Sequence, residues 1–286
     1  MLIIEIYYCI IYIFFGIYEY IKSIFFKDYR IRKLEILNKY INKVIYINLD
    51  ERNERRESIE VLLNKIFDKD KIIRCNAIKD DNGAIGCTKS HIKCLKLAIE
   101  NEWDNVLIME DDIMLTKNIS EYIFENLVKN NFDVIVLGGT EVSYNPFNYK
   151  LLECQTTGSY LVKKLYFKKL KDNFEEGLEK LLNTNIKREF AIDHYWTKLQ
   201  RVDNWKIIYP PLFMQKEGYS NIENKIVNYH KFYDIKSLYK HKIEKTLIYI
   251  FVYMYIKLIN YYNLNVEMCV LIIFLIDFGI DIFNKT

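Results

Sequence analysis

The sequence predicts an α/β fold, a single domain with a mixed, mostly parallel sheet and helices on both faces. Two observations lead to this prediction. Short apolar runs of strand length alternate with longer segments whose apolar residues recur at helical spacing. No internal repeat and no Gly/Ser-rich linker interrupts this alternation, so we expect one domain. Strands that alternate with helices usually pair in parallel, which gives a Rossmann-like architecture.

The first strand and helix are predicted over residues 43–67. KVIYINL (43–49) is rich in β-branched and aromatic residues, which is typical of a strand. The segment after it has apolar residues at helical spacing, at Ile59, Leu62, Leu63 and Ile66. IIRC (72–75) predicts a second strand, and turn residues predict a loop over 80–86.

The alternation continues through four more elements. Residues 87–103 carry apolar side chains at helical spacing, at Ile92, Leu95 and Ile99. VLIME (106–110) predicts the next strand, residues 119–127 another helix, and DVIVLGG (133–139) a further strand. These elements complete the predicted sheet.

The two ends of the chain are apolar. Residues 6–18 form an unbroken apolar run followed by basic residues, which makes 1–33 a candidate membrane anchor. If this run inserts, the positive-inside rule leaves the catalytic domain on the cytosolic side, with lumenal placement left open. Residues 40–225 are the expected catalytic domain. Residues 226–286 are an apolar helical extension, either a buried or amphipathic pair of helices or a membrane-surface segment.

Charge and cysteine content argue against several classes of protein. The net charge of +3 is dispersed along the chain, so no basic face for nucleic acid is expected. The six cysteines show no CxxC motif and no spacing typical of a zinc site, which favours reduced, buried thiols over a disulfide framework. The absence of a GxxxxGK[ST] motif weakens an assignment to phosphoryl or nucleotidyl transferases with a phosphate-binding loop.

The stretch VLIMEDDIML (106–115) contains the strongest candidate for a functional site. Glu110, Asp111 and Asp112 follow one another at the carboxyl end of a predicted strand, where open α/β sheets bind ligands. Three adjacent carboxylates repel one another unless water or a cation neutralises them. A hard cation that also binds substrate phosphates is one explanation, and a solvated acidic turn or a helix N-cap is the other.

Six blocks of sequence resemble glycosyltransferase family 25, which includes bacterial lipooligosaccharide galactosyltransferases and procollagen galactosyltransferases. The blocks are VIYINLDERNERR (44–56), GAIGCTKSHIKCLKLAIE (83–100), VLIMEDD (106–112), TTGSYLVKK (156–164), AIDHYW (191–196) and YPPLFMQKEGYSNIE (209–223). Their common order over residues 43–223 is more specific than any single block. The sequence departs from the family pattern at Ala84, Lys89 and Asn221, which bears on acceptor choice more than on fold.

The resemblance implies a GT-A fold and transfer of a hexose, expected to be galactose, from a UDP-sugar with inversion at the anomeric carbon. It implies Mn²⁺ or Mg²⁺ on Glu110 and Asp112 and a nucleotide-sugar donor as partner, with a glycan or protein hydroxyl as acceptor. A separate carboxylate is needed to take the acceptor proton, and Asp193 is the candidate. Asp193 could instead be an N-cap or a partner of Lys198.

The remaining site residues are assigned by their place in the blocks. The residues expected at the nucleotide sugar are Asn48, Arg52, Arg55, Gly86, Ser90, Glu110 and Asp111. For the arginines the alternative is a solvated helix face, and for Gly86 and Ser90 it is a helix cap. Gln155, Tyr160 and Gln215 are expected on the acceptor side, with core packing as the alternative for Tyr160. His91 is either a structural histidine or a ligand.

A second class of function stays open from the sequence. The chain could be a catalytically inactive, membrane-tethered binding or scaffold protein that keeps the same α/β shell. The acidic triplet argues against this, because three clustered carboxylates without a ligand carry an electrostatic cost.

Overall fold

A computed structural model describes residues 35–116, 121–145, 148–209, 211–220 and 225–227. All of them lie in one compact unit, residues 23–235. The predicted anchor at 1–33 and nearly all of the predicted extension at 226–286 lie outside the described residues, so both assignments stay predictions. Among the described helices, none is long and apolar enough to cross a membrane.

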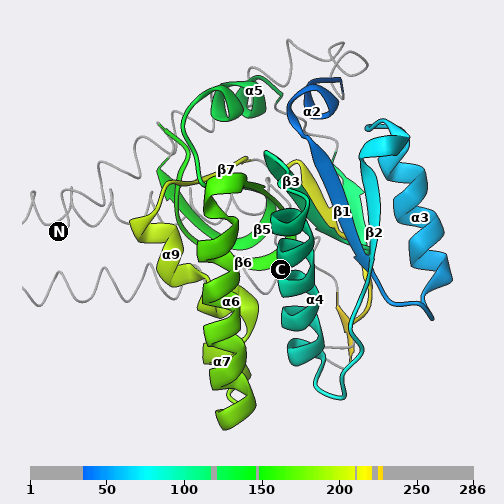
Figure 1. Cartoon of the computed structure of the whole chain (residues 1–286), viewed down its shortest axis with the longest axis vertical. Coiled ribbons are helices and arrows are strands. Elements are labelled where there is room, and N and C mark those ends of the chain that lie inside the picture. Colours follow the sequence, from blue (N-terminus) through cyan, green and yellow to red (C-terminus); the bar gives the residue numbers. More distant parts are fainter. Residues whose placement is uncertain (1–34, 117–120, 146–147, 210, 221–224, 228–286) are drawn as a thin grey trace, which may run out of the picture. The chain divides into compact units, whose positions relative to one another are not determined.

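A six-stranded sheet lies at the centre of this unit, with strand order β2-β1-β3-β6-β5-β7 (Figure 1). The strands are β1 (Lys43–Asn48), β2 (Ile72–Asn76), β3 (Asn105–Glu110), β5 (Val134–Asn145), β6 (Lys150–Lys163) and β7 (Trp205–Ile207). β6 pairs antiparallel with both of its neighbours, and the other five strands run in one direction. The predicted mixed, mostly parallel sheet is therefore confirmed.

Two small strand pairs lie outside this sheet. β4 (Ile113–Leu115) follows the acidic triplet and pairs antiparallel with β8 (Phe213–Gln215). β9 (Gly218–Ser220) pairs with β10 (Lys225–Val227). The β4–β8 pair brings the chain near residue 215 back to the end of β3, a hundred residues away in sequence.

One face of the sheet packs against α2 (Glu35–Tyr40), α3 (Asn53–Leu63) and α5 (Glu121–Lys129). The strands contribute Val44, Leu107 and Ile135 to this core, together with Ile59 and Phe124 from the helices. Burial of these side chains provides the main stabilisation of this layer.

The opposite face packs against α4 (Gly83–Glu100) and α6 (Lys164–Thr184), which lie side by side across the sheet (Figure 1). The helical turns α7 (Lys187–Phe190), α8 (Ile192–Tyr195) and α9 (Thr197–Val202) follow α6, and a 3-10 turn, η1 (Lys69–Lys71), precedes β2. Side chains alternate along a strand, so Ile45, Ile108 and Val136 are buried on this second face. The prediction of helices on both faces is confirmed.

The structure corrects two predicted boundaries. α4 begins at Gly83, inside the predicted loop, because the Asn82 side chain caps the helix by accepting from the Ala84 N–H at 3.2 Å. The strand predicted to end at residue 139 continues to Asn145 as part of a long β5–β6 hairpin with several register shifts. Gly138 allows this hairpin to approach β8, since a Cβ there would lie 2.3 Å from the Phe213 carbonyl oxygen.

Candidate active site

The three carboxylates of the acidic triplet lie in two different environments. Met109 packs into the core beneath α3, so the next side chain along β3, Glu110, points to the opposite face, toward α4. Asp111 and Asp112 follow the end of the strand and lie beside Arg55 of α3. The three carboxylates are adjacent in sequence, but the alternating direction of side chains along β3 places Glu110 on a different side from Asp111 and Asp112.

Asp111 and Asp112 share one guanidinium. Arg55 Nη1 lies 3.2 Å from Asp111 Oδ1 and 3.2 Å from Asp112 Oδ2. Asn48, at the end of β1, donates from Nδ2 to Asp111 Oδ2 at 2.7 Å and to the Arg52 carbonyl at 3.1 Å. β1 and β3 are parallel neighbours, so their carboxyl ends lie at the same edge of the sheet. The residues that meet at this edge are four predicted at the nucleotide sugar and the predicted metal ligand Asp112, namely Asn48, Arg52, Arg55, Asp111 and Asp112.

A pocket of about 330 Å³ opens at this point. Its lining residues are Arg52, Glu54, Arg55, Ser58, Asp111, Asp112, Lys216, Glu217 and Gly218. Three of these side chains are cationic and four are anionic. An anionic ligand such as a diphosphate therefore needs an additional positive charge in order to bind next to Asp111 and Asp112.

Asp112 is the most perturbed carboxyl of the pocket. Burial raises its pKa to about 7, the charge of Glu110 adds to the rise, and Arg55 opposes it. Burial likewise raises the pKa of Asp111, which the hydrogen bond from Asn48 counteracts. Asp112 Oδ1 is buried and has no hydrogen-bond partner among the described residues. This oxygen is therefore available to a ligand.

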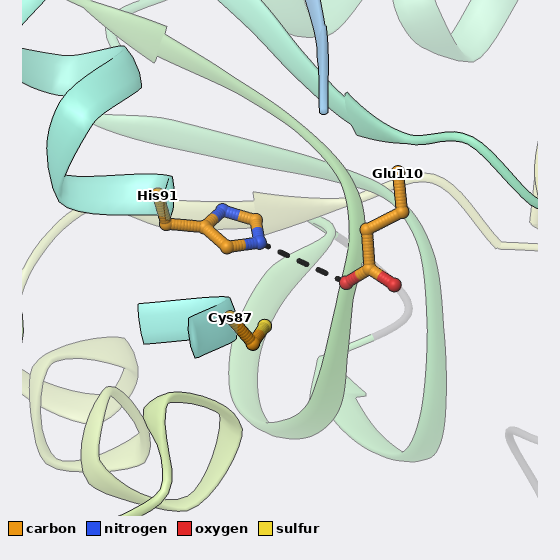
Figure 2. Close-up of side chains that lie close together, drawn as sticks. All are labelled: Cys87, His91 and Glu110. Atoms are coloured by element: carbon orange, nitrogen blue, oxygen red, sulfur yellow. Dashed lines mark ion pairs between the residues drawn. The ribbon is translucent and has the colours of Figure 1, made fainter. Parts of the chain in front are cut away.

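Glu110 has a separate set of partners. Thr157 Oγ1 of β6 donates to Glu110 Oε1 at 3.0 Å, and Gln215 Nε2 of β8 donates to Oε2 at 3.1 Å. His91 Nε2 lies 3.8 Å from Oε1 (Figure 2). Burial alone would raise the pKa of Glu110, but His91, Thr157 and Arg55 hold it below its usual value. Glu110 is therefore held as a half-buried, ionised carboxylate.

Gln215 connects the two environments. Its amide nitrogen bonds Glu110, and its proximity to Asp112 lowers the pKa of that carboxyl. Gln215 Oε1 is buried and has no partner among the described residues. Gln215 was predicted on the acceptor side, and the structure places it between Glu110 and Asp112.

Asp193 lies on α8, near Glu110. Burial raises its pKa, and the charge of Glu110 raises it further against the lowering effect of His194. The Thr156 N–H donates to it, and Thr156 has a φ of 64°. A β-branched residue in that left-handed conformation is strained by about 1–3 kcal/mol. Asp193 thus lies on the Glu110 side of the triplet, beside a strained turn of β6 and outside the residues that line the pocket, and its role as base stays a prediction.

Three predicted site residues have their polar groups engaged inside the fold. Ser90 Oγ donates to the Gly86 carbonyl at 2.7 Å and accepts from the Ile78 N–H at 2.8 Å, and the residue is buried. A Cβ at Gly86 would lie 2.6 Å from the Ile78 oxygen, so this glycine lets the 77–82 loop rest on α4. Tyr160 is fully buried, and its hydroxyl bonds His91 Nδ1 at 2.7 Å. Packing accounts for all three positions better than direct contact with donor or acceptor.

Gln155 lies half-buried on β6, two residues before Thr157, and its acceptor-side role stays a prediction. Sequence reasoning missed Cys87, Thr157 and Lys216. Cys87 precedes His91 by one helical turn, a spacing that could have indicated a shared face. Lys216 lines the pocket, and its backbone N–H donates to the Asp112 carbonyl at 2.7 Å. Only the β4–β8 pairing brings it there, and the local pattern does not predict that pairing.

Comparisons with known proteins bear on this site. Residues 81–169 match the family model of Glycosyltransferase family 25 (LPS biosynthesis protein), and the match spans less than half of the chain. The matched segment contains α4, the acidic triplet and the β5–β6 hairpin. The match is to a family of glycosyltransferases. Over that segment the chain is similar to family 25, in agreement with the resemblance seen in the sequence.

Several solved structures are similar to this chain at low identity. A glycosyltransferase involved in the glycosylation of the major capsid of PBCV-1 is 12% identical, with 64% of this chain and 95% of that chain covered and a TM-score of 0.40. A197 from STIV is 12% identical, with 65% and 93% covered and a TM-score of 0.36. GlyE from Streptococcus pneumoniae TIGR4 is 14% identical, with 65% and 49% covered and a TM-score of 0.34. No curated protein matches the sequence.

Proposed function

We propose that the protein transfers a hexose, galactose in the first instance, from a UDP-sugar to a hydroxyl group of a glycan or protein, with inversion at the anomeric carbon. The observation that carries this proposal is the pocket where Arg55 lies 3.2 Å from both Asp111 and Asp112. It lies at the carboxyl ends of β1 and β3, the usual place for a nucleotide in an open α/β sheet. Arg52, Arg55 and Lys216 supply donors for the diphosphate oxygens.

A divalent cation fits the residues that lie between Glu110 and the pocket at Asp111 and Asp112. Asp112 Oδ1 and Gln215 Oε1 are both buried oxygens without a partner among the described residues, and their side chains are in contact. Carboxylate and amide oxygens are ligands that Mn²⁺ and Mg²⁺ prefer. We assign the cation to Asp112 and Gln215. Glu110 is the other metal ligand predicted from the sequence. It accepts a hydrogen bond from Gln215 Nε2 and so orients the amide group of Gln215.

The bound cation would neutralise the charge that develops on the departing diphosphate. Arg55 keeps Asp111 and Asp112 oriented and offsets their repulsion.

The transfer itself requires a base on the acceptor side. The acceptor oxygen forms a bond to the anomeric carbon as the bond from that carbon to the β-phosphate oxygen breaks, and UDP leaves. The hydroxyl proton passes to Asp193, whose raised pKa makes it a better proton acceptor than an ordinary aspartate. Asp193 suits this role better than Asp112, because a carboxylate bound to a cation is a poor base.

The experiment is a screen of nucleotide sugars, with Mn²⁺ or Mg²⁺ varied and UDP release measured without acceptor. We expect slow, cation-dependent hydrolysis of UDP-galactose that Arg55→Ala abolishes. Arg56→Ala is the matched control, because Arg56 follows Arg55 on α3 and pairs with Glu60 away from the pocket. Equal UDP release by the Arg55→Ala variant and the wild type, or full release with a chelator present, would refute the proposal.

Membrane association is proposed on the sequence of the two ends alone. We expect the full chain to sediment with vesicles and a fragment of residues 34–240 to stay in the supernatant. If the fragment of residues 34–240 still sediments with vesicles, the two ends of the chain are not the segments that bind the membrane.

A further inference from the structure

We propose that Cys87, His91 and Glu110 form a second metal site, selective for Zn²⁺ or a similar borderline-soft cation and distinct from the oxygen-ligand site at Asp112. Cys87 and His91 are four residues apart on α4 and so share one face of the helix. That face lies opposite Glu110 at the end of β3. Figure 2 shows the three side chains converging from these two elements on one space.

The distances suit a shared ion better than a hydrogen bond. His91 Nε2 and Glu110 Oε1 are 3.8 Å apart, too far for a hydrogen bond. At the tetrahedral angle, two ligand atoms about 2.0–2.1 Å from one zinc ion lie about 3.3–3.4 Å apart, so His91 Nε2 and Glu110 Oε1 need to approach by only about half an ångström to share an ion. One ligand atom from each of the three side chains lies within 4.8 Å of the others. Binding of one ion by all three atoms therefore requires only side-chain adjustments.

An unsatisfied nitrogen points into this space. His91 is completely buried, and its Nε2 has no hydrogen-bond partner among the described residues. A buried polar atom without a partner costs about 1–3 kcal/mol, so a ligand bound at this nitrogen would relieve that cost. Its other nitrogen, Nδ1, lies 2.7 Å from the Tyr160 hydroxyl, and the two rings stack at 5.6 Å. Bonding of the second ring nitrogen is how metal-binding histidines are usually oriented.

The set of donor atoms selects the kind of metal. A thiolate, an imidazole and a carboxylate together suit Zn²⁺ or Co²⁺, whereas Mn²⁺ and Mg²⁺ prefer oxygen ligands alone. On binding, the Cys87 thiol loses its proton to solvent and its sulfur becomes the third ligand. Three protein ligands leave one coordination position, which a water molecule can fill.

The site is separate from the donor pocket, although the two share a border. The pocket is lined by neither Cys87 nor His91. Glu110 reaches both regions, because its Oε1 faces His91 and its Oε2 accepts from Gln215, which in turn contacts Asp112. A metal at this site would therefore fix the carboxylate that holds Gln215 and support the donor pocket from behind.

The test is a titration of the full chain, purified with chelator under reducing conditions, with Co²⁺ and then Zn²⁺. We expect one equivalent of Co²⁺ to bind with a thiolate-to-cobalt charge-transfer band, and Zn²⁺ to displace it. Cys87→Ser should remove the band. The matched control is Cys94→Ser, since Cys94 also lies on α4 but stands outside the cluster. The control should bind like the wild type.

Tyr160→Phe keeps the ring and removes the bond to His91, so it should weaken Zn²⁺ binding about 10- to 100-fold. The absence of a thiolate band in the wild type overturns the proposal whether or not the variants fold. An undiminished band in Cys87→Ser overturns it as well. Because the titration contains no nucleotide sugar, its outcome is independent of the proposed transfer activity.

Discussion

The two sides of the β3 end make different use of carboxylates that are adjacent in sequence. On one side, Asp111 and Asp112 lie at an open pocket and share Arg55. On the other, Glu110 is enclosed by Thr157, Gln215 and His91. Their pKa values move in opposite directions, upward for Asp112 and downward for Glu110.

Adjacent like charges at the end of a strand therefore need not form one site. The pleat of β3 directs Glu110 to the α4 face, and the chain past the strand end directs Asp112 toward α3. Arg55 on one side and His91 and Thr157 on the other offset part of the repulsion that the sequence suggests, and the charge of Glu110 still raises the pKa of Asp112.

The largest effect is expected at Asp193. Asp193→Asn removes the base and keeps the side-chain volume, so transfer should fall about 10²- to 10⁴-fold while UDP binding is retained. Parallel measurements of transfer rate and of UDP affinity by calorimetry test this. Full transfer by the variant would exclude Asp193 as the base.

A large effect on stability is expected at Asp112. Its pKa rises from 3.8 to about 7 on folding, so the folded state favours the protonated form. The stabilising contribution is present below pH 3.8 and is lost as the pH rises through 7. The full shift corresponds to about 4 kcal/mol, an upper bound for a carboxyl that interacts with Glu110.

Asp112→Asn should therefore raise the melting temperature at pH 8, by several degrees, and change it little near pH 4. Thermal unfolding of both proteins across this range measures the difference. A variant that is less stable than the wild type at pH 8 would show that Asp112 is stabilised by its partners instead.

A smaller effect is expected for donor binding at Arg55. Arg55→Ala removes one charged donor from the pocket and leaves Asp111 and Asp112 without their shared partner, so UDP affinity should fall about 10- to 100-fold. Arg56→Ala should leave it unchanged. Equal losses in the two variants would point to a general effect of α3 on the fold.

The smallest effect separates a structural residue from a binding residue. Ser90→Ala removes the hydrogen bond that holds the 77–82 loop on α4 and a second one within the helix, and should cost about 1–3 kcal/mol of unfolding free energy. UDP affinity of the folded variant should be unaltered. A specific loss of UDP affinity without loss of stability would restore the donor-site role predicted for Ser90.

Much of the fold followed from local pattern. The strands at 43–48 and 105–110 are short, nearly continuous apolar runs because both of their faces are buried, and the helices between them show period 3.6 because each buries one face. The β5–β6 hairpin was predicted less well, since its register shifts depend on packing against β8 and on Gly138. Such contacts between distant segments leave no periodic signal.

The candidate site was predicted in part. Asn48, Arg55 and Asp111 come together because parallel strands end at one edge of the sheet, and this follows from topology. The separation of Glu110 from Asp111 and Asp112 was only partly predictable. Side chains alternate along β3, so the buried Met109 indicates that Glu110 points to the opposite face, but this does not predict where the chain turns after Glu110. Gln215 and Lys216 reach the site only through the β4–β8 pairing, which the sequence does not show.

The most direct test of the divided triplet is Mn²⁺ binding followed by electron paramagnetic resonance in the presence of UDP. We predict that the wild type and Cys87→Ser each bind one Mn²⁺ with UDP, and that Asp112→Asn binds none. Equal Mn²⁺ binding by Asp112→Asn and the wild type, or loss of Mn²⁺ in Cys87→Ser, would contradict the assignment of the donor cation to the Asp112 side.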